Sequence, residues 1–138
     1  MSAMINIDVP DLGSALEFYT QAFNLTLRRY LAGQIAELAG WPVAVFLLQK
    51  EDGSIGAGSS PRTYERHWTP VHLDVVVDDI DEGLARAVRA GAVVEHDTRT
   101  HVWGKIAVLA DPYGHGFCLV QFLNGGYGEI VEPTQVST

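Results

Sequence analysis

The chain has 138 residues and a formal charge of −8, because 17 Asp and Glu outnumber 9 Lys and Arg. Nucleic-acid-binding proteins draw most of their affinity from clustered Lys and Arg, so we expect no nucleic-acid partner for this acidic chain. The single cysteine excludes an intrachain disulfide. The longest apolar run, residues 43–48, is too short to cross a bilayer, and no basic, apolar leader opens the chain. We therefore expect a cytoplasmic protein with no membrane partner.

The first half of the sequence predicts a strand, a helix and three further strands. Residues 5–9 alternate between apolar and polar side chains, which is the pattern of a half-buried strand. Asp11 is a suitable N-cap for the following helix, and Asn24 tolerates the left-handed conformation in which helices often end. One face of this helix carries the apolar side chains of Leu12, Leu16, Tyr19 and Phe23. The next predicted strands are residues 25–30, 34–39 and 43–49.

The second half repeats this order. Residues 73–77 are typical of a strand, Asp78 and Asp79 of a helix start, and Gly91 of a helix end. The apolar face of this second helix consists of Ile80, Leu84, Ala87 and Val88. The later predicted strands are residues 92–96, 105–110 and 117–122, and the segment DPYG, residues 111–114, suits a tight turn with a structural role.

The repeat predicts a single domain over residues 1–138, made of two similar βαβββ modules. Module one covers about residues 3–50, a linker rich in Gly and Ser about 51–66, module two about 67–124, and a tail 125–138. One module alone is too small to bury a sheet face well. We therefore expect an α+β fold in which both modules form a curved mixed sheet with the helices outside. The concave face of such a sheet forms a cleft suited to a small molecule.

Several segments carry a resemblance to a known superfamily. They are residues 71–79, VHLDVVVDD, and residues 111–120, DPYGHGFCLV, with the first-half signature VPDL at residues 9–12 and the pair Phe18 and Tyr19. They resemble the vicinal oxygen chelate superfamily, which includes glyoxalase I, bleomycin-resistance proteins and extradiol dioxygenases. The resemblance covers about residues 4–122 and is to the glyoxalase-like, bleomycin-resistance-like branch. It implies the two-module fold, a cleft for a small molecule and a homodimer.

The resemblance also implies four positions at which metalloenzymes of the superfamily hold a divalent cation with His and Glu. These positions fall here on Met4, Phe46, His72 and Cys118. Phe46 has no donor atom, and Met4 and Cys118 are soft ligands unsuited to nickel, magnesium or octahedral zinc. We therefore expect no metal and no cofactor, and interpret Cys118 as a small buried apolar residue. A soft-metal site of Met4, His72 and Cys118 is the alternative.

Strand alternation places polar side chains on one face of each module's first strand. Met4, Asn6 and Asp8 share one face, and His72 and Asp74 share the matching face in module two, while the opposite faces are apolar. This pattern favours a polar cleft, because unpaired polar groups are costly to bury. The alternative is that Asp8 lies in water and that His72 and Asp74 satisfy each other. His72 is the best candidate for a general base, although no nucleophile is identified beside it.

Residues 98–104 are predicted as a loop, and the resemblance makes Arg99, His101 and Trp103 candidate ligand contacts near the cleft mouth. The alternative is a surface loop whose Trp103 folds back on the core. The predicted ligand-binding residues are Met4, Asn6, Asp8, Phe46, His72, Asp74, Trp103 and Cys118.

The predicted function is binding of a small organic molecule in a metal-free cleft, with a role in resistance or sequestration. The first alternative is a metal-dependent enzyme of the superfamily, similar to lactoylglutathione lyase or a dioxygenase. Two others are a metal-free acid–base catalyst that uses His72 and a structural domain whose cleft is filled by side chains.

Overall fold

The computed structural model describes residues 1–133, and the end of the predicted tail, residues 134–138, lies outside them. Module one forms a four-stranded sheet in the order β1-β4-β3-β2, in which β1 and β4 are parallel and the other pairs antiparallel. Its elements are β1 (Ile5–Val9), α1 (Leu12–Phe23), β2 (Thr26–Leu31), β3 (Ile35–Ala39) and β4 (Val45–Gln49).

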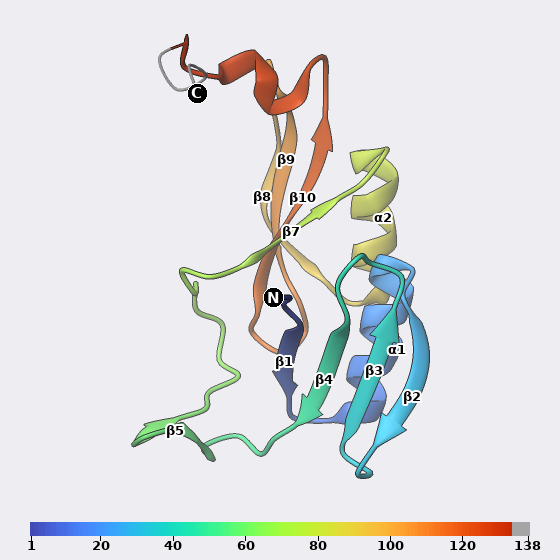
Figure 1. Ribbon diagram of the computed structural model, residues 1–138, viewed down its shortest axis with the longest axis vertical. Coiled ribbons are helices and arrows are strands. Elements are labelled where there is room, and N and C mark those ends of the chain that lie inside the picture. The colour runs from blue at the N-terminus through green and yellow to red at the C-terminus, as the bar shows by residue number, and fades with distance from the viewer. Residues whose placement is uncertain (134–138) are drawn as a thin grey trace.

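Module two repeats this topology as a second four-stranded sheet in the order β7-β10-β9-β8. Its elements are β7 (Leu73–Val76), α2 (Ile80–Ala90), β8 (Val93–His101), β9 (Gly104–Ala110) and β10 (Gly116–Phe122). The expected α+β fold of two βαβββ modules with the helices outside is therefore confirmed, and α1 packs against α2 on one side of the molecule (Figure 1). The strands are hydrogen-bonded as two sheets, one per module, where the sequence predicted a single curved sheet.

The predicted helix ends are confirmed in both modules. The Asp11 carboxylate accepts a hydrogen bond from the Ser14 amide at 3.0 Å, and Asn24 ends α1 in the left-handed region at φ 55°. Asp79 caps α2 through the amides of its first turn, and Gly91 ends it at φ 123°. A second interaction that caps both helices was not predicted from the sequence. Gln49 Oε1 accepts from the first amide of α1 and Gln121 Oε1 from the first amide of α2, each at 2.9 Å.

Three segments differ from the prediction. β8 continues to His101, so residues 98–101 are strand and not loop, because they pair with β9 through two register shifts. The linker contains a small hairpin of β5 (Ile55–Ala57) and β6 (Ser60–Pro61), which lies away from the two modules (Figure 1). The tail contains the short 3-10 helix η1 (Gly126–Ile130).

A buried polar contact joins the two modules. The hydroxyl of Tyr19 in α1 donates to Asp111, in the turn between β9 and β10, at 2.5 Å. Asp111 is 4% exposed and also accepts from the amides of Tyr113 and His115, both at 2.8 Å. Burial, followed by the Asp111 charge, raises the pKa of Tyr19 well above its usual value, so the hydroxyl remains a donor. The turn predicted as structural therefore also fixes module two against module one.

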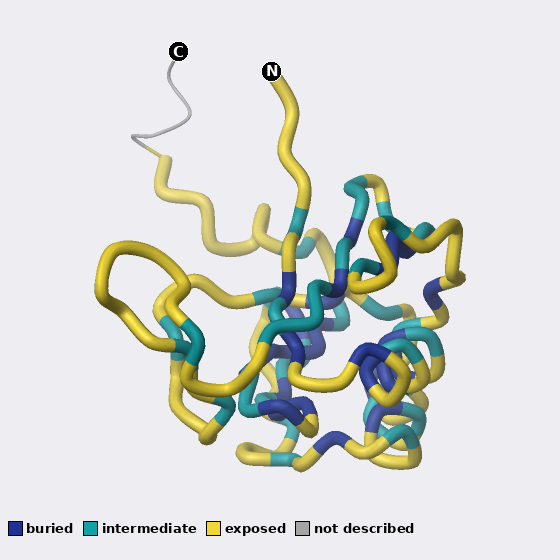
Figure 2. Tube along the Cα trace, turned by 90° about the horizontal axis from the view of Figure 1, so that it is seen from below, coloured by how far each residue is buried: buried dark blue, intermediate teal, exposed yellow. Residues whose placement is uncertain are grey.

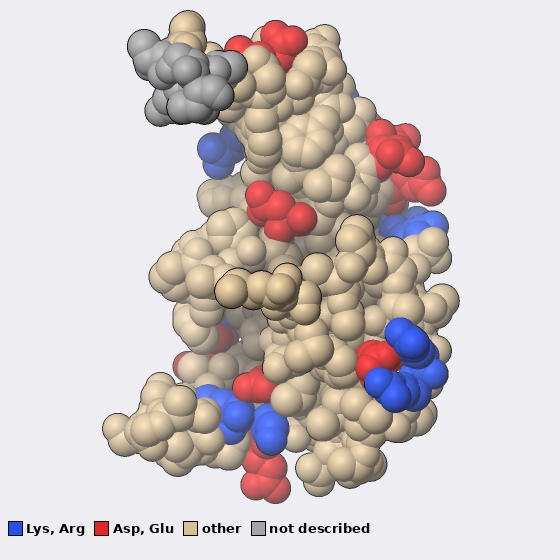
Figure 3. Space-filling view, viewed as in Figure 1, with Lys and Arg blue, Asp and Glu red and all other residues tan. Residues whose placement is uncertain are grey.

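The apolar core spans both modules and lies between the sheets and the helices. Figure 2 shows the buried residues gathered inside a surround of exposed loops, with the N-terminal residues exposed. On the face in Figure 3, Lys and Arg occur in small groups, mostly beside acidic side chains, and form no continuous basic stripe. Among residues 1–133, no helix is long and apolar enough to cross a membrane.

Candidate functional site

A cavity of about 420 Å³ lies at the seam between the modules. We call it the seam cavity. Its walls come from β1, the end of α1, the segment that leads into β7, and the start of β10. The residues used below that line it are Asn6, Asp8, Tyr19, Phe23, His72 and His115. Three of the predicted ligand-binding residues, from both modules, therefore line one cavity.

Asp8 contributes less charge to this cavity than the sequence suggested. Arg62, from the linker, donates from Nε to Asp8 Oδ2 at 2.7 Å, and its Nη1 donates to Ser54 Oγ and to the carbonyl of Ile55. His115 Nε2 lies 2.7 Å from the carbonyl oxygen of Asp8. The ion pair with Arg62 balances the charge of the Asp8 carboxylate. It also fixes the linker, which carries Arg62, to β1 at the cavity wall. The alternative, an Asp8 carboxylate free in water, differs from the structure, in which this side chain is 35% exposed and pairs with Arg62.

His72, Asp74 and Cys118 form a compact cluster beside the seam cavity. His72 Nε2 lies 3.3 Å from Asp74 Oδ1, and Asp74 is the β7 partner of Cys118 in β10. One donor atom from each lies within 4.8 Å of the others. Burial first, and then the charge and hydrogen bond of Asp74, raise the pKa of the Cys118 thiol to about 11. The thiol is therefore neutral at pH 7, consistent with a buried apolar role.

We expect replacement of Asp74 with Asn to lower the pH at which Cys118 reacts with iodoacetamide. The wild-type rate should rise with a midpoint near the thiol pKa of about 11, and loss of the Asp74 charge moves this midpoint down. The raised folded-state pKa also implies stability that is lost as the pH rises through about 11. Alkylation followed by intact-mass measurement over a pH series gives the midpoint. Asp97→Asn, in exposed β8, is the control and leaves it unchanged, and an unchanged midpoint in Asp74→Asn would contradict the cluster.

The donor set does not match the one that metalloenzymes of the superfamily use. Phe46 pairs with Asn6 across module one and offers no ligand atom, and Met4 is 64% exposed before β1. Only His72 and Cys118, of the four positions, belong to the cluster, and Asp74 is added. One nitrogen, one carboxylate oxygen and one soft sulfur do not fit a site for a hard divalent cation.

An aromatic contact holds His72 from outside the cluster. The ring centroids of Trp68 and His72 are 4.6 Å apart, and the Arg66 guanidinium lies 5.8 Å from the Trp68 ring centroid. Arg66 in turn donates to both carboxylate oxygens of Glu95, at 2.6 and 2.8 Å. A Cβ on Gly116 would lie 3.0 Å from the Trp68 ring, so this glycine lets the indole pack closely. Trp68 thus restricts the His72 ring at the cavity edge.

Trp103 lies in a different part of module two. It stacks on His101 with centroids 5.2 Å apart and planes 3° apart, and it contacts Tyr127 in η1 at 5.2 Å. Trp103, His101 and Arg99 line none of the three described cavities. Sequence reasoning missed Tyr19, Phe23 and His115 as wall residues. Their place depends on how α1 and the β9–β10 turn meet, which no local pattern reports.

A second hollow, of about 400 Å³, lies along the outer edge of β7. It shares Ile5 and Leu73 with the seam cavity, and Asp74 lines it. The His72 and Asp74 side chains therefore stand where these two hollows meet. The seam offers a guest both apolar walls and hydrogen-bonding groups.

Comparisons with known proteins agree with the two-module fold. A family model described as a glyoxalase-like domain matches residues 4–120. An uncharacterized protein of Mycobacterium tuberculosis H37Rv is 30% identical over 118 residues, which is 82% of this chain and 69% of that protein. An uncharacterized Mycobacterium bovis protein is 30% identical over the same length and is covered to 78%.

Two solved structures share the fold. The fosfomycin resistance protein FosX of Listeria monocytogenes has a TM-score of 0.71 and 15% identity, with 95% of this chain and 98% of that chain covered. A glyoxalase/bleomycin resistance/dioxygenase family enzyme of Burkholderia phytofirmans has a TM-score of 0.67 and 20% identity, with coverage of 87% and 97%. At such identities the likeness extends to the fold alone.

Proposed function

The chain belongs to the glyoxalase-like domain family, and on that premise we propose that it binds a small organic molecule in the seam cavity without a metal ion. The observation that carries this proposal is the cavity itself, about 420 Å³, in which Asn6, Asp8 and His72 meet from two modules. A volume of this size is in the usual range for small-ligand sites. Apolar walls with a few polar groups are also typical of such sites.

The chemistry of the cavity favours a guest that is cationic or that donates hydrogen bonds. The Asn6 amide oxygen and the His72 imidazole can accept, and the Asp74 carboxylate lies 3.3 Å from His72 at the cavity edge. Asp8 is already paired with Arg62, so the acidic group that a guest would meet is Asp74, which lines the adjoining hollow beside His72. Phe23 and Tyr19 supply aromatic wall. A suitable guest therefore places a positive or hydrogen-bond-donating group near Asp74 and packs an apolar body against the rings of Phe23 and Tyr19.

A role in resistance or sequestration is part of this proposal. Its support is the fold shared with the Listeria fosfomycin resistance protein. The alternative, a metal-dependent enzyme similar to lactoylglutathione lyase or a dioxygenase, is favoured by one observation, the three donor atoms of His72, Asp74 and Cys118 within 4.8 Å. The soft sulfur of Cys118 and the apolar Phe46 at the matched positions count against it. His72 remains the candidate for acid–base chemistry, and its partner Asp74 would orient the ring.

Thermal unfolding in the presence of cationic aromatic drugs and glutathione adducts tests ligand binding. A ligand at about 100 times its Kd stabilises the folded state by about 2.7 kcal/mol, which raises the Tm by several degrees. His72→Ala should abolish most of this rise, because it removes a wall residue. His96→Ala, which changes an exposed histidine outside the cavity, should leave it intact. Equal rises in both variants, or none in the wild type, would contradict the proposal.

The proposal includes a homodimer that covers the outer strands β1 and β7. Each is the outermost strand of its sheet, and Val76 on β7 is 60% exposed, with Val71 just before it 90% exposed. Val76→Asp should shift the mass measured by light scattering toward monomer, because it places a charge in the interface. Val93→Asp, at the opposite edge of the same sheet, is the control and keeps the dimer. A monomeric wild type at high concentration would contradict it.

A further inference from the structure

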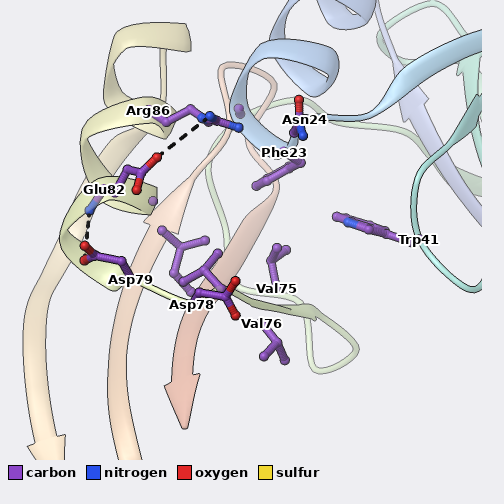
Figure 4. A pocket seen from close by; sticks show the side chains of 13 residues that line it. Phe23, Asn24, Trp41, Val75, Val76, Asp78, Asp79, Glu82 and Arg86 are labelled. Carbon is purple, nitrogen blue, oxygen red and sulfur yellow. Dashed lines mark hydrogen bonds and ion pairs between the residues drawn. The ribbon is translucent and has the colours of Figure 1, made fainter.

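A third cavity, of about 280 Å³, lies where the end of α1 meets the start of α2 (Figure 4). We call it the interhelix cavity. It shares only Phe23 with the seam cavity, so the two have largely separate walls. Figure 4 shows side chains from α1, α2, β7 and the Trp41 loop facing one space. The proposed ligand site does not use this space, and Val76, which belongs to the proposed dimer face, lines it.

The interhelix cavity has an aromatic wall. The rings of Phe23 and Trp41 have centroids 5.6 Å apart and planes tilted by 47°, and Val75 and Leu119 extend the apolar surface. Gly40 fixes the approach of Trp41. It has φ +137°, and a Cβ there would lie 3.0 Å from the Leu25 side chain. The chain just before Trp41 therefore packs closely against the residues that follow α1.

Some of the charged side chains at the rim of the cavity have hydrogen-bond or ion-pair partners, and one does not. Asp79 caps α2 through the amides of Asp81 and Glu82, and Glu82 lies 4.0 Å from Arg86 in an ion pair. Asp78 is exposed, lines the cavity and makes no side-chain hydrogen bond or ion pair with residues 1–133. Figure 4 shows its carboxylate close to Val75 and Val76 at the lower rim. One carboxylate is therefore available to a ligand.

The end of α1 adds negative potential to the same space. The backbone amide of Gly91 closes α2 on the carbonyls of Ala87 and Val88, and Arg89 stands in its last turn. Within the described chain, α1 has neither a basic residue in its last turn nor an equivalent cap, and Asn24 ends it beside the cavity. The last carbonyls of a helix are unpaired and carry its negative pole. Figure 4 shows the Arg86 side chain reaching toward this end of α1, so a second positive group in the cavity would be stabilised mainly by Asp78.

We propose that the interhelix cavity binds a small primary ammonium ion that carries one flat apolar group, the chemistry of an arylalkylamine. The ammonium donates to the Asp78 carboxylate, and the flat group packs against Trp41 and Phe23. Aromatic faces also attract a cation directly. This inference is independent of the seam cavity, because Asp78 and Trp41 do not line it.

Phenethylammonium chloride is the probe, followed by tryptophan fluorescence in a Trp68→Phe, Trp103→Phe background, where Trp41 is the remaining indole. We expect saturable quenching in this background. Asp78→Asn should weaken the affinity about tenfold, because it removes a charge-assisted hydrogen bond. Asp81→Asn, which changes an acid in the first turn of α2 that does not line the cavity, should leave the affinity unchanged.

The anion 3-phenylpropionate is similar in size to phenethylammonium but has the opposite charge, so it should not compete with phenethylammonium for the cavity. Quenching that does not saturate, or equal affinity in Asp78→Asn and Asp81→Asn, would overturn the proposal. The denaturation midpoints of both variants are measured alongside. Asp78 is exposed and without a described partner, so its replacement should not change them.

Discussion

Replacement of Asp111 with Ala should lower the free energy of unfolding by about 3–5 kcal/mol, as removal of one partner from a buried charged network does. Asp111 is 4% exposed and accepts three hydrogen bonds, from the Tyr19 hydroxyl and the amides of Tyr113 and His115. The Ala variant leaves these three donors without their acceptor inside the protein. Urea denaturation followed by circular dichroism measures the loss.

Tyr19→Phe is the matched variant, because it removes one of the three donors and keeps the ring. We expect it to cost about 1.5–3 kcal/mol, the usual value for a hydrogen bond to a charged group. A double-mutant cycle of the two changes should show strong coupling, since both act on one contact. If Asp111→Ala cost less than about 1 kcal/mol, the contact between α1 and the β9–β10 turn would not hold the modules together.

Replacement of Gly114 with Ala should destabilise the protein by about 3 kcal/mol or more. Gly114 has φ +87°, and an added Cβ would lie 2.4 Å from the carbonyl oxygen of Tyr64 and 2.9 Å from that of Glu65. The new methyl group therefore meets backbone atoms, which cannot rotate away as a side chain can. The displaced segment leads to Trp68 and His72, so ligand binding in the seam cavity should weaken too.

Gly53→Ala separates the clash from the backbone strain. Gly53 has a similar φ, +81°, but a Cβ there meets nothing within 4 Å. We expect it to cost about 1 kcal/mol, the penalty of the left-handed conformation alone. Thermal unfolding of the two variants gives the comparison. Equal losses would show that the contact between Gly114 and the linker does not constrain the fold.

The repeat and the helix ends could be predicted because they depend on local chemistry. Asp11, Asn24, Asp79 and Gly91 act on amides or torsions within a few residues of themselves. The length of β8 could not be predicted, because its polar residues 98–101 become strand only by pairing with β9. Propensity is a weak guide where a neighbouring strand supplies the hydrogen bonds.

The candidate site was predictable only within one strand. His72 and Asp74 stand two residues apart and meet as expected, at 3.3 Å. Cys118 joins them because β10 pairs with β7 in a register that sets it opposite Asp74, as the matched strand positions indicated. The pairing of Asp8 with Arg62 crosses 54 residues, and the wall residue His115 lies 107 residues from its partner Asp8. Contacts of this range depend on how the modules and the linker pack, which strand alternation does not encode.

The proposal that the seam cavity contains no metal ion is tested most directly by measuring the divalent-metal content of the protein. The protein is purified without a metal-affinity tag and without chelators, and elemental analysis gives the moles of each metal per mole of chain. Because Phe46 has no donor atom and Met4 is 64% exposed outside the cluster of His72, Asp74 and Cys118, we predict far less than one divalent ion per chain. One bound ion per chain, lost in a His72→Ala variant, would contradict the metal-free cleft and favour the metal-dependent enzyme.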